Sequence, residues 1–241
     1  PNKQVVQLIF SQIDVDRMDY LLRDAYFTGA SYGKFDLTRI LRVIRPIENG
    51  IAFQQNGMHA VEDYVVSRYQ MYMQVYFHPA TRAMEVLLQN LLKRARTIYP
   101  DQKEYFQLTS PRLIPFFEEE VTIQDYLNLD DGVMNTYFQV WMDSPDTILS
   151  DLAQRYINRK VFKSILFTED KRKDLAILEK LIKEVGFNPT YYTAIHQNFD
   201  LPYDIYRPEL EKPRTQIEMI RKDGSLAELS QLSPLVAALA G

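Results

Sequence analysis

The sequence predicts a mainly α-helical protein with a small α+β region at its C-terminal end. The 241 residues include 16 Tyr and 13 Phe but 8 Gly, a balance that favours packed helices over a glycine-rich barrel or a doubly wound nucleotide fold. Apolar residues recur at helical spacing through most of residues 1–159, and short strand-like stretches around one amphipathic helix follow. We therefore expect two parts, a helical part at 1–159 and an α+β appendage at 160–241.

Periodicity and capping residues define the elements expected in the helical part. One helix should span 5–32, and a second should begin after Asp36 and stop at Pro46, because proline cannot continue a helix. Residues 50–57 resemble a short hairpin arm closed by an Asn-Gly pair. A long helix should cover 59–77 and resume after Pro79 as far as residue 98. Further helices are expected at 123–129, at 131–143 and after an N-terminal cap at Ser144.

The appendage should contain strands as well as a helix. Residues 160–167 and 190–199 are expected to be strands, with an amphipathic helix between them that stops at Gly186. A hairpin should turn at Asp223-Gly224, a pair typical of tight β-turns. The proline-rich stretch 201–214 is expected to be an irregular loop.

Composition and motif absences restrict the possible functions. The chain has no cysteine, which excludes disulfides, thiolate metal ligands and a cysteine nucleophile, and which is compatible with a cytoplasmic location. The net charge of −4 argues against a general nucleic-acid-binding surface but allows a local basic pocket. No apolar run is long enough to span a membrane.

The three histidines are far apart, and no P-loop, dinucleotide fingerprint or zinc-protease motif is present. We expect no complete catalytic centre here. Because the sequence starts with Pro-Asn-Lys and has no initiator Met, we expect a piece of a longer chain.

The run "IDVDRMDYLLRDAYFTG" gathers charged and phenolic side chains on one helix. Asp16, Tyr20 and Asp24 are four residues apart and share a face, with Arg17 beside them. A carboxylate suits a divalent cation, and an arginine suits phosphate oxygens. The alternative is a solvent-facing helix surface with charge pairs.

A second group lies on the long expected helix, in "SRYQMYMQVYFHPATRAMEVLL". Arg68, Tyr72 and Tyr76 are again four residues apart, and His78 follows. Tyrosine rings could contact a base or sugar while Arg68 contacts a phosphate. The alternative is that the tyrosines pack between helices.

The two quoted segments together resemble a known family of enzymes. The first is similar to the segment of HD-domain phosphohydrolases that supplies their last metal-binding aspartate. Within that superfamily it looks like the deoxynucleoside triphosphate triphosphohydrolases, the group that includes the mammalian SAM-and-HD-domain enzyme and its bacterial relatives. The second segment is similar to a later helix of the same group. The resemblance covers residues 5–98 well, and it implies an HD-domain-like helical bundle for the helical part.

The resemblance implies a role for each residue that matches the family pattern. Asp16 would be a metal ligand, for a divalent ion (Mg, Mn, Zn, Fe or Ni) that also needs histidine and aspartate ligands from an upstream segment. The residues implied to bind the substrate are Arg17, Tyr20, Asp24, Arg68 and Tyr76. Those implied to bind an activating nucleotide at a subunit interface are Asp36, Arg39 and His78. Pro79 replaces a basic residue of some relatives, and Gln54 and Asn56 lie in an arm that is more basic elsewhere, which weakens the regulatory assignment.

The implied reaction is hydrolysis of a deoxynucleoside triphosphate to a deoxynucleoside and triphosphate. The implied assembly is a cytoplasmic homotetramer with no membrane or specific nucleic-acid partner. The chain would be the C-terminal portion of such an enzyme, lacking the upstream His-Asp motif, and it is expected to be inactive alone. The alternatives are an HD phosphohydrolase that acts on another nucleotide and a non-catalytic helical oligomerisation module.

Overall fold

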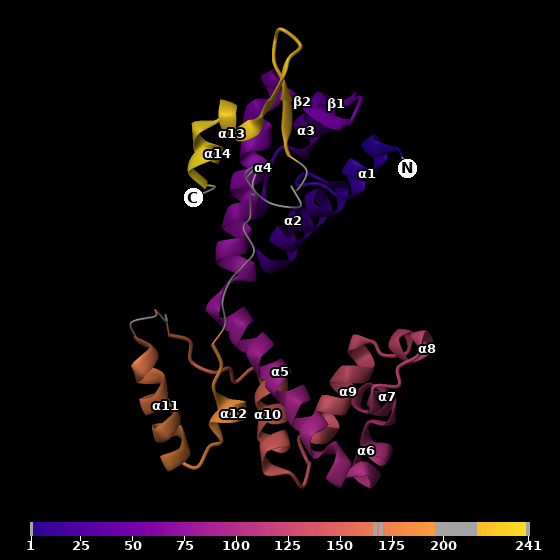
Figure 1. Cartoon of the computed structure of the whole chain (residues 1–241), viewed down its shortest axis with the longest axis vertical. Coiled ribbons are helices and arrows are strands. Elements are labelled where there is room, and N and C mark those ends of the chain that lie inside the picture. The colour runs from indigo at the N-terminus through magenta and orange to yellow at the C-terminus, as the bar shows by residue number, and fades with distance from the viewer. Residues whose placement is uncertain (1, 166–167, 169–170, 196–215, 240–241) are drawn as a thin grey trace. The chain divides into compact units, whose positions relative to one another are not determined.

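Helices make up most of the computed structural model, which describes residues 2–165, 168, 171–195 and 216–239. The described residues also form one four-stranded sheet, so the prediction of a mainly α fold with a small α+β portion is confirmed. The chain groups into two units, Pro1–His78 with Asn198–Gly241, and Pro79–Gln197 (Figure 1). We call them unit 1 and unit 2. This grouping differs from the expected division at residue 159, because the hairpin near the C-terminus belongs to unit 1.

Unit 1 contains short helices around the longer α4, together with the sheet. Its described elements are α1 Lys3–Ile9, α2 Val15–Thr28, α3 Leu37–Val43, β1 Ile44–Ile47, β2 Gly50–Gln54, α4 Met58–Met71, a π-helical turn Tyr72–Tyr76, β3 Glu218–Ile220, β4 Leu226–Glu228, α13 Leu229–Leu232 and α14 Pro234–Leu239, with 3-10 turns at Ser31–Gly33 and Gln55–Gly57.

The helix expected at 5–32 is instead two helices separated by a break. Phe10 ends α1, and Asp14 begins α2 by accepting a hydrogen bond from the backbone N–H of Arg17 at 2.8 Å. An aspartate in this position satisfies a backbone donor that has no partner inside the helix. The break therefore follows from the capping preference of Asp14, which periodicity alone did not show.

The hairpin of unit 1 lies a few residues earlier than expected. Helix α3 stops at Val43, and residues 44–47 form β1, which pairs antiparallel with β2 in the register Ile44 to Phe53. The Asn56-Gly57 pair lies in a 3-10 turn after β2, so it does not close the hairpin. Pro46 fits β1 because β1 is an edge strand of the sheet, where a missing N–H costs no ladder bond.

The sheet joins distant parts of the sequence. The strand order is β1-β2-β3-β4, with β2 and β3 parallel and with β3 and β4 forming the hairpin predicted at Asp223-Gly224. Phe53 pairs with Met219, and both side chains are buried in the core of unit 1. The C-terminal hairpin is therefore held to unit 1 by backbone pairing and by apolar burial.

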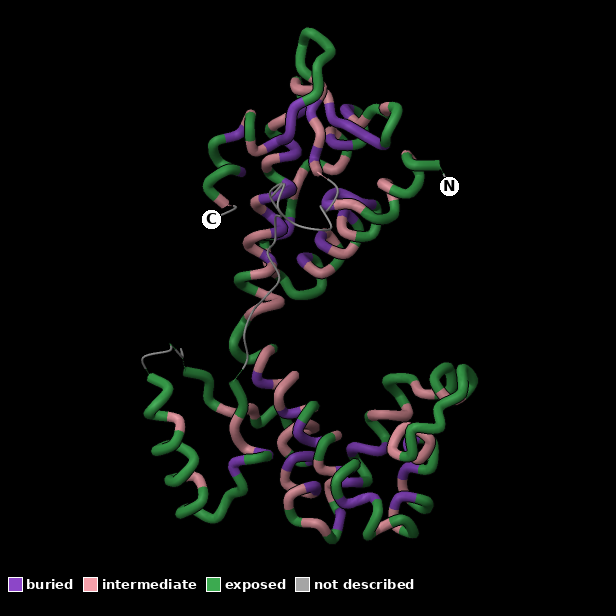
Figure 2. Tube along the Cα trace, viewed as in Figure 1, coloured by how far each residue is buried: buried purple, intermediate pink, exposed green. Residues whose placement is uncertain are grey.

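The core of unit 1 lies between α2, α4 and the sheet. Figure 2 shows buried stretches along α2 and α4, and they include Leu21 and Tyr64, which are fully buried. A side chain at Gly33 would lie 2.8 Å from the carbonyl oxygen of Leu21, so only glycine fits this close approach. This packing fixes α2 against α4 and so positions the site described below.

Unit 2 is helical throughout its described residues. Its elements are α5 Pro79–Ile98, α6 Lys103–Thr109, α7 Ile114–Glu118, α8 Ile123–Leu127, α9 Asp131–Trp141, α10 Thr147–Ile157, α11 Arg172–Glu184 and α12 Pro189–Tyr192, with 3-10 turns at Tyr99–Asp101 and Pro111–Leu113.

Three local expectations for unit 2 are wrong. The described residues 160–165 are not a strand, and residues 189–192 of the second expected strand form the short helix α12, capped by Asn188. The cap of α10 is Asp146 in place of Ser144, because the Asp146 carboxylate accepts from the N–H of Leu149 at 2.8 Å. Residues 166–167, 196–199 and the loop expected at 201–214 lie outside the described residues.

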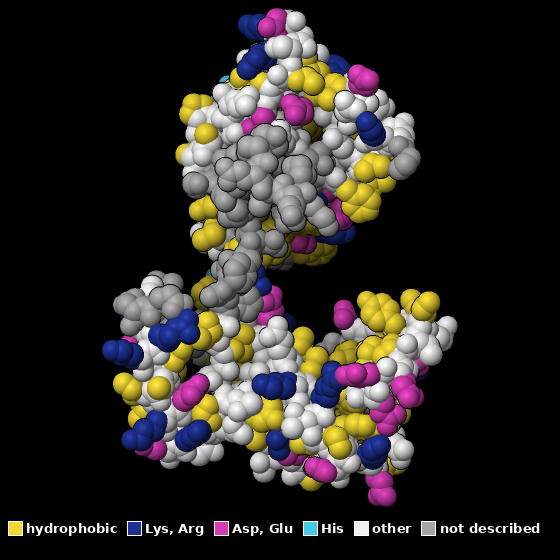
Figure 3. All heavy atoms as spheres, in the orientation of Figure 1, with side chains coloured by type: hydrophobic (Ala, Val, Ile, Leu, Met, Phe, Trp, Pro, Cys, Tyr) yellow, Lys and Arg dark blue, Asp and Glu magenta, His cyan; other side chains and the backbone are white. Residues whose placement is uncertain are grey.

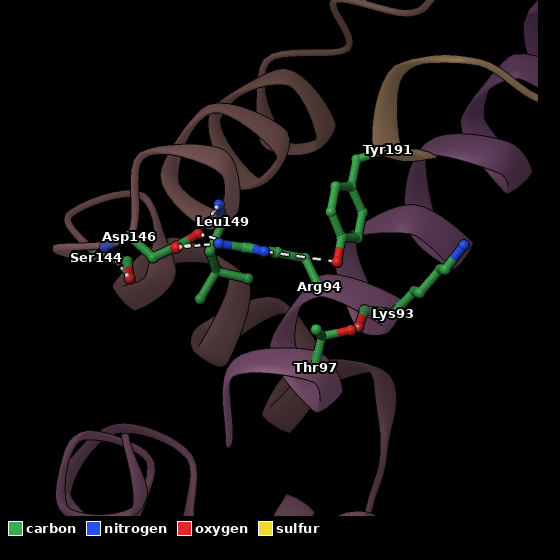
Figure 4. A network of polar contacts seen from close by, with 7 residues as sticks. All are labelled: Lys93, Arg94, Thr97, Ser144, Asp146, Leu149 and Tyr191. Carbon is green, nitrogen blue, oxygen red and sulfur yellow. Dashed lines mark hydrogen bonds and ion pairs between the residues drawn. The ribbon is translucent and has the colours of Figure 1, made fainter. Parts of the chain in front are cut away.

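A charged network ties α5, α10 and α12 together (Figure 4). The Arg94 guanidinium donates to both carboxylate oxygens of Asp146, at 3.0 and 2.5 Å, and lies 5.2 Å from the centre of the Tyr191 ring. Burial favours a neutral carboxyl, but Arg94 and the Leu149 N–H outweigh it and lower the pKa of Asp146. The network braces the core of unit 2, in which Trp141 is fully buried.

Hydrophobic side chains are also exposed on unit 2. They gather over α8 (Figure 3), where Ile123, Tyr126 and Leu127 are mostly exposed. None of the described helices is both long enough and apolar enough to cross a bilayer.

Candidate functional site

The site is built on α2 and α4, the two helices that carry the residue groups singled out in the sequence. At the start of α2, Asp14 is fully buried and caps the helix. The same carboxylate pairs with the Arg17 guanidinium, which also donates to the carbonyl oxygen of Ser11 at 2.8 Å. About a third of the Arg17 side chain remains exposed (34%). Arg17 is therefore anchored, and its charge is partly offset by Asp14.

The predicted face of α2 lies along the same side of the helix. Asp16 is exposed in the first turn, while Tyr20 and Asp24 are half-buried further along. Burial and the neighbouring Tyr72 phenol raise the pKa of Tyr20 to about 12, so its hydroxyl stays protonated at neutral pH and can donate a hydrogen bond.

The π-helical turn after α4 brings Tyr76 to this face. The Tyr76 hydroxyl donates to Asp24 Oδ2 at 2.7 Å, and the Tyr76 ring meets the Tyr20 ring edge to face at 6.2 Å. Burial and this hydrogen bond raise the pKa of Tyr76. The structure thus brings Tyr76 to Tyr20 and Asp24, which lie more than fifty positions earlier in the sequence.

Arg68 is the most unusual residue of the group. Arg68 belongs to α4, and 5% of its surface is exposed to solvent. Its Nε atom has no hydrogen-bond partner. Within the described residues no carboxylate pairs with it. Its guanidinium carbon lies 5.5 Å from the centre of the Tyr72 ring. Burying a cation without a counter-charge costs free energy, so an anion bound at this position would be favourable.

The guanidinium groups of Arg17 and Arg68 both lie near the phenols of Tyr20 and Tyr64. Each of these charges favours the ionised form of Tyr20 and of Tyr64, although burial of both rings has the larger, opposite effect. The two arginines therefore flank the same part of unit 1. An anion placed there would interact favourably with both guanidinium groups.

The sequence did not single out Tyr64. It is fully buried, and its hydroxyl donates to the carbonyl oxygen of Gln12 at 2.8 Å, which ties the break before α2 to α4. Tyr64 lies four residues before Arg68, so the spacing that selected Arg68, Tyr72 and Tyr76 could have found it.

A complete metal site is not found in the part of the chain that the structure describes. No group of three or more His, Cys, Asp or Glu side chains comes together there. Asp16 is exposed and forms the single carboxylate that the family pattern assigns to a metal. The described residues alone therefore do not make up a divalent-ion site.

The three residues assigned to a regulatory nucleotide have local structural roles or lie at the surface. Asp36 caps α3 through the N–H of Arg39, at 2.8 Å, and Arg39 donates to the carbonyl oxygen of Asn56 at 2.9 Å. His78 is exposed. The Asp36 and Arg39 contacts hold α3 to the turn after β2.

Comparison with known proteins identifies the family. A family model described as an HD associated region matches residues 35–241. The chain therefore belongs to the HD-associated-region family. The match begins after α2, so the helix that carries Asp16 to Asp24 lies outside the matched range.

Several curated proteins are similar to most or all of the chain. The uncharacterized protein YwfO of Bacillus subtilis (strain 168) is 48% identical over 241 residues, which are 100% of this chain and 55% of that protein. A deoxynucleoside triphosphate triphosphohydrolase SAMHD1 homolog of Dictyostelium discoideum is 24% identical over 196 residues, or 80% of this chain and 35% of that protein. The chain spans about half the length of the first curated relatives that it matches, 55% and 56%.

A solved structure supports the same relationship. A phosphohydrolase from Bacteroides thetaiotaomicron matches with a TM-score of 0.77 and 26% sequence identity, over 99% of this chain and 61% of that chain. The relatives thus place the chain among proteins of the HD-domain phosphohydrolase superfamily.

Proposed function

We propose that this chain supplies the phosphate-binding and sugar-binding side of an HD-type phosphohydrolase that acts on deoxynucleoside triphosphates. The observation that carries the proposal is Arg68, a buried guanidinium with an unpartnered Nε atom. A protein gains little stability by keeping such a charge in its interior. A phosphate ligand would provide the missing counter-charge.

The two arginines would share the phosphate chain unequally. Arg17 is already paired with Asp14, so it would contribute a weaker and more solvent-screened attraction. Arg68 has no such pair among the described residues and would carry most of the interaction. As the bond between the α-phosphorus and the 5′-oxygen breaks, both cations would stabilise the negative charge on the phosphate oxygens.

The phenols would hold the sugar. Asp24 accepts the Tyr76 hydroxyl through Oδ2, and no other described group bonds to its carboxylate side chain, so Oδ1 can accept a sugar hydroxyl. Tyr20 remains protonated and lies against the Tyr76 ring, which narrows the space beside that carboxylate. This arrangement suits a deoxyribose, with the 3′-hydroxyl on Asp24.

The proposed reaction is attack of water on the α-phosphorus, which releases a deoxynucleoside and intact triphosphate. Asp16 would offer one metal ligand, and the other ligands would come from outside the described residues. We also propose, from the resemblance to the family, that Asp36, Arg39 and His78 contact an activating nucleotide and that the enzyme is a homotetramer.

Ligand-induced thermal stabilisation tests the proposal. A deoxynucleoside triphosphate should raise the melting temperature of unit 1 more than the matching ribonucleoside triphosphate or the deoxynucleoside monophosphate, because its triphosphate contacts Arg68 and its sugar fits beside Asp24. A purely structural helical module would give no shift with any of them, and that result would refute the binding proposal. A preference for the monophosphate would instead favour a different nucleotide substrate.

Substitution of Asp16 tests its assigned role. In a longer protein that contains this chain and hydrolyses deoxynucleoside triphosphates, Asp16→Ala should abolish turnover, while Asp19→Ala on the same helix should not. An unchanged kcat for Asp16→Ala would remove Asp16 from the metal shell. The chain by itself should release no deoxynucleoside.

A further inference from the structure

A π-helical turn interrupts the helix that carries Arg68. It spans Tyr72–Tyr76, and the backbone N–H of Phe77 donates to the carbonyl oxygen of Tyr72 at 2.7 Å, five residues back. Turns of this kind are rare, usually single, and frequently found at functional sites. This one lies between Arg68 and the hydrogen bond from Tyr76 to Asp24.

The turn changes which side of the helix Tyr76 faces. In an α-helix with 3.6 residues per turn, a step of four residues overshoots a full turn by about 40°. In an uninterrupted α-helix, Tyr76 would therefore be rotated by about 80° from Arg68. A π-helical turn is wider, so the step from Tyr72 to Tyr76 turns less and offsets the drift. The Tyr72 and Tyr76 rings accordingly meet at 5.3 Å.

Tyr72, the residue at which the turn begins, also lies against Arg68, because the two residues are one α-helical turn apart and the Tyr72 N–H donates to the carbonyl oxygen of Arg68. The guanidinium carbon lies 5.5 Å from the Tyr72 ring centre, a distance at which a cation is attracted to the face of an aromatic ring. Because Arg68 Nε has no partner, the Tyr72 ring is the contact among the described residues that fixes the guanidinium. The N–H groups are thereby left for a ligand.

We propose that the π-helical turn Tyr72–Tyr76 positions the phosphate-binding and sugar-binding groups of the site, with Tyr72 as the positioning residue for Arg68. The inference rests on the proposed function. Tyr72, the first residue of the turn, contacts Arg68, and the turn brings Tyr76, its last residue, to Asp24 and Tyr20 on α2. It therefore couples the cation that binds the phosphate chain to the phenol that borders the sugar.

The exposed residues of the turn provide a control for substitutions of Tyr72. Met73 and Gln74 are exposed, whereas Tyr72 and Tyr76 are half-buried. Gln74→Ala is the matched control, because it changes a residue of the same turn and keeps the Tyr72 ring.

The experiment measures binding of inorganic tripolyphosphate to the chain by calorimetry, with helicity and melting temperature recorded for every variant. Gln74→Ala should bind like the unmodified chain.

Substitution of Tyr72 tests its role directly. Tyr72→Phe keeps the ring and should retain tripolyphosphate affinity, whereas Tyr72→Leu should lose about 2-fold to 30-fold, the range of a cation–π contact. Equal affinity of the two variants would overturn the role of Tyr72. If the unmodified chain does not bind tripolyphosphate, the proposed function itself fails. If the unmodified chain binds but no variant is weakened, this inference alone fails.

Discussion

Replacement of Arg68 should cost the protein little stability, although the residue is almost completely buried. Arg68→Met keeps a long side chain but removes the charge. Replacing a buried ion pair with apolar groups is often neutral or stabilising by about 1–4 kcal/mol, and Arg68 has no paired carboxylate among the described residues. The loss of the contact with the Tyr72 ring offsets about 0.5–2 kcal/mol of this. The change in the free energy of unfolding should therefore lie between a loss of about 2 kcal/mol and a gain of about 3.5 kcal/mol.

Urea unfolding of the variant, followed by far-ultraviolet circular dichroism, measures this difference. The result would contrast with a typical buried truncation, which destabilises by about 2–5 kcal/mol. Tyr64→Leu provides the comparison, because Tyr64 is also fully buried on α4 and donates a hydrogen bond to Gln12, so its loss should be destabilising. A loss of more than about 2 kcal/mol in Arg68→Met would show that Arg68 is a structural residue and would refute the reasoning.

Three further predictions concern packing and charge. Asp146→Asn should lower the free energy of unfolding of unit 2, followed by its buried tryptophan, by about 1–3 kcal/mol at pH 7 because it breaks the pair with Arg94. Because the pKa of Asp146 is lowered below 3.8, this difference should shrink as the pH falls below about 4 and disappear once the pH is below the lowered pKa, and a constant difference would contradict the argument. Tyr76→Phe should cost unit 1 about 1 kcal/mol in urea unfolding through its lost bond to Asp24, and no loss would mean that this bond is weak. Gly33→Ala should lower the melting temperature of unit 1 at a cost of about 1–3 kcal/mol, since its Cβ would lie 2.8 Å from a backbone oxygen, and an unchanged value would contradict the packing argument.

Local patterns in the sequence predicted the helices that carry the site. Periodicity at four-residue spacing selected Arg68, Tyr72 and Tyr76, and the structure places all three near α2. Periodicity could not show the contact between Tyr76 and Asp24, because these residues lie 52 positions apart and meet through tertiary packing. It also gave no sign of the π-helical turn.

Long-range pairing accounts for the part of the sheet that the sequence did not predict. The parallel contact between β2 and β3 joins Phe53 to Met219, and nothing in either short segment identifies its partner. The C-terminal hairpin therefore looked like part of a separate appendage. At the local level, the roles of Asp14 and Asp146 as helix caps depended on which of several polar residues faced a free N–H, which only the folded backbone decides.

The most direct measurement for the central claim is calorimetric titration of a deoxynucleoside triphosphate into the chain and into two variants. Arg68→Met removes the buried cation, and Arg42→Met removes an exposed arginine of the same unit as a control. We predict saturable binding by the unmodified chain and by Arg42→Met, and at least about tenfold weaker binding by Arg68→Met. Equal affinities of the unmodified chain and Arg68→Met would contradict the assignment of Arg68 to a phosphate site.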